Sequence, residues 1–148
     1  MNRQVKIFSI FLLFALPNIS CAQASFKNSI FAEALGNAGY YSINYERQLK
    51  HQIVARLGFS ALSDGLIIFP VTLGKFWGED KHHFEFAGGV DFSSSDNDIY
   101  DNQIIVTGFL GYRYQKPDGR FLLRIGLTPL WNDGYFLLSG GVSMGYRF

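Results

Sequence analysis

The residues best suited to chemistry stand together in the stretch KHHFE, which contains His82, His83 and Glu85. In a strand alternate side chains share a face, so His83 and Glu85 are expected on one side, about 7 Å apart. An imidazole and a carboxylate at that spacing can bind a metal ion or act as an acid–base pair. Such a site needs a third group, for which Ser143 or Asp91 are candidates by residue type alone. The alternative is that both histidines begin a strand at a solvated edge of the fold, while Glu85 forms an ion pair with an arginine inside it.

A second group of potential ligands is the stretch SDNDIYDN, which places Asp96, Asp98 and Asp101 in one loop. An oxygen-rich loop attracts calcium, but this loop lacks the glycine and the closing glutamate of an EF-hand. The alternative is a solvated surface loop. Neither group amounts to a recognisable site, so we predict no metal, no cofactor and no catalytic residue.

The overall composition excludes several classes of partner. The chain has 148 residues, which is room for one domain, and its 13 Lys and Arg against 12 Asp and Glu indicate no basic face for nucleic acid. Its 15 Phe, 8 Tyr and 16 Gly argue against both disorder and a helical bundle, because glycine weakens helices while aromatic residues favour pleated surfaces.

The N-terminal stretch MNRQVKIFSIFLLFALPNISCAQA has the layout of a secretory signal. Two basic residues precede an apolar segment of ten residues, and AQA supplies a small-x-small cleavage pattern. Ten apolar residues are too few to span a bilayer. We therefore predict that residues 1–24 form a cleaved signal peptide for export through the Sec pathway, and that residues 25–148 form the mature domain. A competing interpretation makes Cys21, the single cysteine, the acylated first residue of a lipoprotein.

From residue 29 onward the sequence alternates between apolar and small or polar residues, in runs separated by turn residues such as NAG, LSDG and WNDG. Eight runs is an even number, as in single-chain bacterial barrels. We predict an all-β fold, an eight-stranded antiparallel up-and-down transmembrane β-barrel, whose last strand lies beside its first. The predicted strands cover residues 29–36, 39–48, 52–62, 66–77, 82–92, 103–114, 119–128 and 135–148.

One face of these runs carries large apolar side chains and almost no charge, Arg47 and Lys75 excepted. The other face carries small residues interspersed with full charges, which suits the inside of a narrow closed barrel rather than a surface in water. Because buried charges persist only when paired, we predict an interior ion network that fills the lumen and leaves no wide channel. Its predicted members are Glu33, Glu46, Arg56, Glu85, Asp91, Arg113, Arg120, Arg124 and Arg147.

Aromatic residues gather where alternate strands end. If the first strand starts on the periplasmic side, strands two, four, six and eight end at the same rim, and a ring of aromatic side chains there is typical of a membrane interface. The longest break, SSSDNDIYDN, is then extracellular. The alternative is that aromatic residues are simply common in strands. The predicted girdle comprises Tyr45, Trp77, Phe84, Tyr112, Tyr114, Phe121, Tyr146 and Phe148.

Two prolines affect the predicted strands. Pro70 lies within LIIFPVTLG and cannot donate a hydrogen bond to a neighbouring strand, and a closed barrel offers no free edge for it. We expect a bulge or a looser outer rim at this position. Pro129 is expected to cause no difficulty, because it falls where the seventh predicted strand ends.

The stretches GYYSINYERQL, FPVTLGKFWGEDKHHFEFAGGVDF, GRFLLRIGLTPLW and GGVSMGYRF resemble the small outer-membrane barrels of Bacteroidetes, which are eight-stranded barrels of the OmpA and OmpX kind, mostly without an assigned activity. The resemblance covers most of the mature chain and specifies architecture rather than chemistry. It implies insertion into the bacterial outer membrane by the barrel-assembly machinery, which reads a final aromatic residue preceded by alternating apolar residues. Val142, Met144, Tyr146 and Phe148 fit that signal.

The leading functional hypothesis is a structural or membrane-maintenance role among outer-membrane lipids and lipopolysaccharide, without enzymatic activity. The first alternative is a narrow, porin-like pore or a barrel that binds a small solute. The second alternative is a lipid-modifying enzyme, since outer-membrane lipid A deacylases and palmitoyltransferases are also small eight-stranded barrels. The deacylases use His and Ser two residues apart on a strand, and the predicted mature strands contain no His-x-Ser.

Overall fold

The computed structural model describes residues 26–63, 65–95 and 103–148 of the chain. The predicted signal peptide with Cys21 lies outside the described residues, as do the three aspartates Asp96, Asp98 and Asp101.

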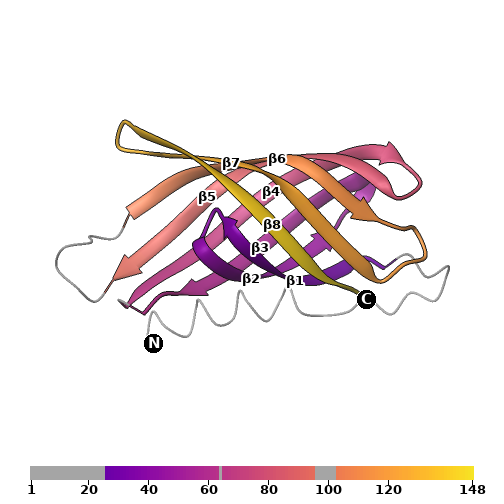
Figure 1. Cartoon of the computed structure of the whole chain (residues 1–148), viewed down its shortest axis with the longest axis horizontal. Coiled ribbons are helices and arrows are strands. Elements are labelled where there is room, and N and C mark those ends of the chain that lie inside the picture. The colour runs from indigo at the N-terminus through magenta and orange to yellow at the C-terminus, as the bar shows by residue number, and fades with distance from the viewer. Residues whose placement is uncertain (1–25, 64, 96–102) are drawn as a thin grey trace, which may run out of the picture.

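Eight antiparallel strands, each paired with the next in sequence, close into a barrel because the last strand also pairs with the first (Figure 1). The strands run obliquely to the long axis of the barrel. This arrangement confirms the predicted fold class and the predicted neighbour of the last strand. The strands are β1 (Asn28–Gly36), β2 (Gly39–Gln48), β3 (Ile53–Ala61), β4 (Leu66–Glu79), β5 (His82–Ser95), β6 (Gln103–Gln115), β7 (Phe121–Asn132) and β8 (Tyr135–Arg147), with a short 3-10 turn η1 (Lys50–Gln52) between β2 and β3.

Alternation along each strand separates an outer from an inner face. In β8, for example, Val142 and Met144 are exposed on the outside, whereas Ser143 and Arg147 are buried inside. Successive side chains of a strand point to opposite faces, so a period of two in the sequence becomes an apolar outside and a polar inside. Among the described residues, no helix is long and apolar enough to cross a membrane.

The barrel has two rims. At the terminal rim, where β1 begins and β8 ends, Asn28 and Phe148 exchange backbone hydrogen bonds of 3.0 and 2.9 Å. Strands β2, β4 and β6 also end at the terminal rim, and β1, β3, β5 and β7 end at the opposite end of the barrel, the distal rim.

Aromatic side chains occupy the outer face at both rims. The predicted girdle residues lie at the terminal rim, where ring contacts join neighbouring strands, such as Trp77 with Phe84 at 6.3 Å and Tyr114 with Phe121 at 6.2 Å. A second set of aromatic residues lies at the distal rim. It was not predicted from the sequence, because the prediction compared only the strand ends that meet at the terminal rim. Its exposed members on the outer face are Tyr41, Phe59, Phe69, Phe92, Trp131 and Phe136.

The two prolines are accommodated by glycines rather than by bulges. Across the described residues of β3 and β4 the register is the same on both sides of Pro70, so the expected bulge is not present. The expectation for Pro129 was also wrong, because β7 continues past it to Asn132. A Cβ added to Gly58, across from Pro70, or to Gly108, across from Pro129, would lie 3.0 Å from the proline Cγ. In both places the missing side chain of the glycine leaves room for the ring.

Candidate functional site

Five charged side chains from five strands meet inside the barrel. They are at most 3% exposed, and each makes at least one ion pair with another member. The strands β2, β3, β5, β6 and β7 each supply one, because each presents a charged residue at an inward position. This arginine–glutamate cluster consists of Glu46, Arg56, Glu85, Arg113 and Arg124.

Glu85 is the most connected member of the cluster. Its Oε1 accepts hydrogen bonds from Arg56 Nη2 at 2.7 Å and from Arg124 Nη2 at 3.0 Å. Its Oε2 accepts from Arg113 Nη1 and from Arg124 Nε, both at 3.1 Å. Arg124 therefore binds this carboxylate with two donors, which is the strong, geometrically specific form of the pair.

Glu46 joins the same arginines from the other side. It accepts from Arg56 Nη2 at 2.6 Å and, through both carboxylate oxygens, from Arg113 at 2.5 and 3.1 Å. Three guanidinium groups thus share two carboxylates. Removing such charges from water is costly, and the arrangement is sustained only because nearly every donor and acceptor is used.

Three buried phenylalanines surround the cluster. The guanidinium carbon of Arg124 lies 4.1 Å from the ring centre of Phe109, and that of Arg113 lies 4.7 Å from Phe76. Phe31 contacts two guanidinium groups, at 5.1 and 5.2 Å. The sequence reading missed these residues because it assigned only small and charged side chains to the interior. Their position in the alternation of each strand was the signal that could have found them.

The terminal end of the lumen is closed by a different set of contacts. Arg147 donates to the backbone carbonyls of Lys116 at 2.7 Å, Gly119 at 2.9 Å and Phe26 at 3.0 Å. It therefore lies inside, as predicted, but binds the turn between β6 and β7 rather than a carboxylate. On the side of the cluster that faces the terminal rim, Arg113 Nε also donates a hydrogen bond to Gln115 Oε1 at 2.7 Å.

Arg120 was wrongly placed in the interior. It is exposed, precedes β7, donates a hydrogen bond to the hydroxyl of Tyr146, and lies over the rings of Tyr146 and Phe26 at 5.5 and 4.8 Å. Alternation fixes a side chain's face only within a paired strand, and this residue belongs to the turn that precedes one.

Glu33 and Asp91 are buried but lie outside the cluster. Among the described residues neither forms an ion pair, and both carboxylate oxygens of Asp91 and one of Glu33 lack a hydrogen-bond partner in the protein. Hydroxyl groups nearer the distal rim share this property. We call this region the distal lumen, and it comprises Glu33, Ser60, Thr72, Asp91, Thr107 and Thr128.

His82 and His83 do not form a joint site with Glu85. His82 is exposed on the outer face, with Nδ1 2.7 Å from the hydroxyl of Tyr112, whereas His83 is buried with Nε2 3.2 Å from the carbonyl of Gln115. Glu85 is occupied by arginines, as in the alternative interpretation. Across residues 26–63, 65–95 and 103–148 no group of three or more His, Cys, Asp or Glu side chains is placed to hold a metal ion.

The four residues of the predicted assembly signal share one face. Val142, Met144, Tyr146 and Phe148 are all exposed on the outside of the barrel, in a row that runs from the middle of β8 to the terminal rim. Through the pairing of β8 with both β1 and β7, this apolar row is continuous with those of its neighbours.

Comparison with known structures identifies other barrels of the same architecture. The N-terminal β-barrel domain of Pseudomonas aeruginosa OprF matches with a TM-score of 0.64 and 16% sequence identity, over 82% of this chain and 98% of that chain. The Yersinia pestis outer membrane protein Ail, in a phospholipid bilayer nanodisc, matches with a TM-score of 0.55 and 13% identity, over 82% of this chain and 99% of that chain. No protein-family model and no curated protein matches the sequence. The fold is therefore one that outer-membrane proteins use.

Proposed function

We propose that this protein is an integral outer-membrane barrel with a filled, non-conducting lumen, and that its role is structural or in membrane maintenance rather than enzymatic. The single observation that carries the proposal is the arginine–glutamate cluster, which joins five strands across the lumen with side chains at most 3% exposed. An open channel requires water along the whole axis, and this cluster occupies the axis.

The outer face supports a position in a membrane. Large apolar side chains are exposed on every strand, for instance Ile30, Leu73, Phe86, Ile125 and Met144. A surface of this kind in water would be an unusually large apolar patch, whereas in a bilayer it is the favourable one. The aromatic residues at both rims fit the two membrane–water interfaces.

The membrane position is tested by fractionating cells that express the full chain, then running the purified protein on a denaturing gel with and without boiling. We expect it in the outer-membrane fraction, with a faster-migrating unboiled form, because the closed barrel stays compact in detergent until it is heated. Recovery as a soluble protein whose mobility does not change on boiling would exclude the proposal.

The filled lumen is tested by planar-bilayer recording. We expect no reproducible conductance steps from the unmodified protein, with Glu46→Ala combined with Arg113→Ala as the positive control for opening the cluster. Reproducible open-channel steps from the unmodified barrel would instead support the second candidate, a narrow pore. The unpartnered oxygens of the distal lumen favour that candidate, since buried polar groups of this kind are normally satisfied by water.

A further inference from the structure

The outer face of the strands carries two cations within an otherwise apolar band. Arg47 of β2 and Lys75 of β4 occupy outward positions on either side of β3, where Arg47 pairs with Ala55 and Lys75 pairs with Ile53. Neither forms an ion pair among the described residues of the barrel. Two unpaired cations on an apolar surface require an anionic partner or contact with the polar edge of the membrane.

Both cations lie at the height of the terminal-rim girdle. Arg47 is two residues beyond Tyr45 along β2, and Lys75 is two residues before Trp77 along β4. The ammonium group of Lys75 lies 5.4 Å from the Trp77 ring centre. In a membrane, aromatic residues of this kind mark the level of the lipid headgroups.

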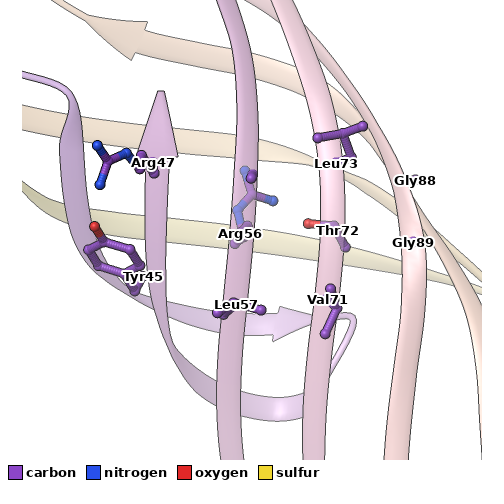
Figure 2. Close-up of a pocket in the computed structure, with 10 residues that line it drawn as sticks. Tyr45, Arg47, Arg56, Leu57, Val71, Thr72, Leu73, Gly88 and Gly89 are labelled. Carbon is purple, nitrogen blue, oxygen red and sulfur yellow. The ribbon is translucent and has the colours of Figure 1, made fainter. Parts of the chain in front are cut away.

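A groove of about 270 Å³, lined at one end by Arg47, crosses the outer face of the barrel from β2 to β5 (Figure 2). Lys75 does not line it, but follows Leu73 of its lining by two residues along β4. Figure 2 shows Arg47 and Tyr45 on one side of it, and Gly88 on the other. The groove crosses β2 to β5 because small residues, Ala55 and Gly88, stand at outward positions between larger ones. Its walls are formed by Tyr45, Leu57, Val71 and Leu73.

We infer that this groove holds an acyl chain of one anionic glycerophospholipid, whose phosphate lies between Arg47 and Lys75. The inference rests on the proposed membrane position. Charge complementarity supports the occupant, since a guanidinium and an ammonium at headgroup height match a phosphate and the apolar groove beside them matches its chain. The longest segment between two strands follows β5, which ends at the distal rim, so the inference takes the terminal rim to face the periplasm, where the leaflet consists of glycerophospholipids.

The test uses the two tryptophans, which lie at opposite rims. The full barrel carrying Trp131→Phe reports on Trp77 beside the groove, and the barrel carrying Trp77→Phe reports on Trp131 at the distal rim. Each is reconstituted into phosphatidylcholine vesicles with a minor fraction of phosphatidylglycerol, and either lipid is supplied with brominated acyl chains that quench tryptophan fluorescence. From the quenching of Trp77 by each brominated lipid, we expect the site beside it to bind phosphatidylglycerol roughly tenfold more tightly than phosphatidylcholine, because two cations lie near one anionic headgroup. Quenching of Trp131 should show no preference between the two lipids.

Two pairs of variants locate the site. Arg47→Gln with Lys75→Gln should reduce the preference at Trp77 to about onefold, whereas Lys50→Gln with Lys116→Gln, exposed turn residues at the same rim, should leave it near the unmodified value. Gly88→Leu should reduce it by filling the groove, and Gly140→Leu on the outer face of β8 is the matched control. An added Cβ at Gly88 or Gly140 has its nearest neighbour at 3.9 or 3.8 Å, so both positions have room for a side chain.

Four results would overturn the inference. These are no preference in the unmodified barrel, an equal preference at Trp131, an equal loss from the turn-lysine pair, or displacement of phosphatidylglycerol by an equal amount of lipid A. A change of mobility on boiling verifies that each variant is folded. A barrel that inserts but shows equal quenching by both lipids contradicts the lipid site alone. A protein that shows no mobility change and no quenching by any brominated lipid contradicts the proposed function as well.

Discussion

The arginine–glutamate cluster and the distal lumen both contain buried acidic side chains, but only those of the cluster form ion pairs. In the arginine–glutamate cluster, each carboxylate is held by at least two guanidinium groups at 2.5 to 3.1 Å. In the distal lumen, Glu33 and Asp91 are similarly buried but form no ion pair with any described residue. Both parts carry buried polar side chains, so polarity alone does not decide which part becomes a rigid connection between strands.

The difference shows what holds a narrow barrel closed. The cluster ties β2, β3, β5, β6 and β7 to one another through side chains, in addition to the backbone ladders of adjacent strands. Buried polar atoms without a protein partner, as in the distal lumen, are normally satisfied by water. We therefore expect most side-chain stabilisation across the lumen to come from the cluster, and little from the distal lumen.

The largest effect is expected from Glu85→Gln. This change leaves three buried guanidinium groups with Glu46 as their only carboxylate, and losing one member of a buried ion pair typically costs about 3–5 kcal/mol of unfolding free energy. Urea unfolding in detergent micelles, followed by tryptophan fluorescence, measures the loss. Glu79→Gln, an exposed position near the end of β4, is the control and should change stability little. A loss at position 85 no larger than that of the control would show that the cluster does not stabilise the barrel.

An intermediate effect is expected from an added methyl group beside the cluster. In Gly111→Ala the new Cβ would meet the Ile125 carbonyl oxygen, with Gly126 Cα at 2.6 Å and Phe109 Cζ at 2.9 Å. Most of these atoms are backbone and cannot move aside, so we expect a loss of about 1–3 kcal/mol in the same unfolding assay.

Gly58→Ala, nearer the distal rim, provides the matched comparison for Gly111→Ala. Its new Cβ would meet the side-chain oxygen of Asn44 and the Pro70 ring, the latter at 3.0 Å. The proline ring is fixed to the backbone, but its contact is the wider one, and the Asn44 side chain can shift where backbone cannot, so a smaller loss is expected. Equal losses at the two glycines would show that both parts of the lumen are packed with the same rigidity.

The smallest effect is expected from Asp91→Asn. Because this carboxylate has no cationic partner, its charge contributes no ion pair, and the amide should change unfolding free energy by less than about 1 kcal/mol. The measurement is made side by side with Glu85→Gln under identical conditions. A loss comparable to that of Glu85→Gln would remove the distinction between the two parts of the lumen.

The strands and their faces were predictable because they depend on local sequence. A period of two places Glu46, Glu85 and Arg124 inside wherever the strand is regular, and the observed strands begin and end near the predicted positions. The errors lie where regularity stops. Arg120 stands in a turn, and Pro129 was taken to end a strand that continues because Gly108 gives it room.

The composition of the ion network was less predictable than its existence. Of nine charged residues assigned to it, five form the cluster, two are buried without an ion pair, Arg147 binds backbone carbonyls and Arg120 is exposed. Nothing in the local pattern separates Glu85 from Asp91, since both are inward acidic residues of β5. The phenylalanines that contact the arginines also stand at inward positions of the alternation. They were not predicted there, because only small and charged side chains were assigned to the interior.

The sequence by itself determined the number of strands, the face of each side chain within a regular strand and the apolar character of the outside, because all three follow from alternation within single strands. Tertiary structure decided which charges meet. Arg113 of β6 binds Glu46 of β2, 67 positions away in the sequence and on a strand that does not pair with β6. It also binds Glu85 of the neighbouring strand β5, 28 positions away and two residues out of register. Such contacts depend on how the sheet closes and how far its strands are staggered, which are properties of the whole barrel.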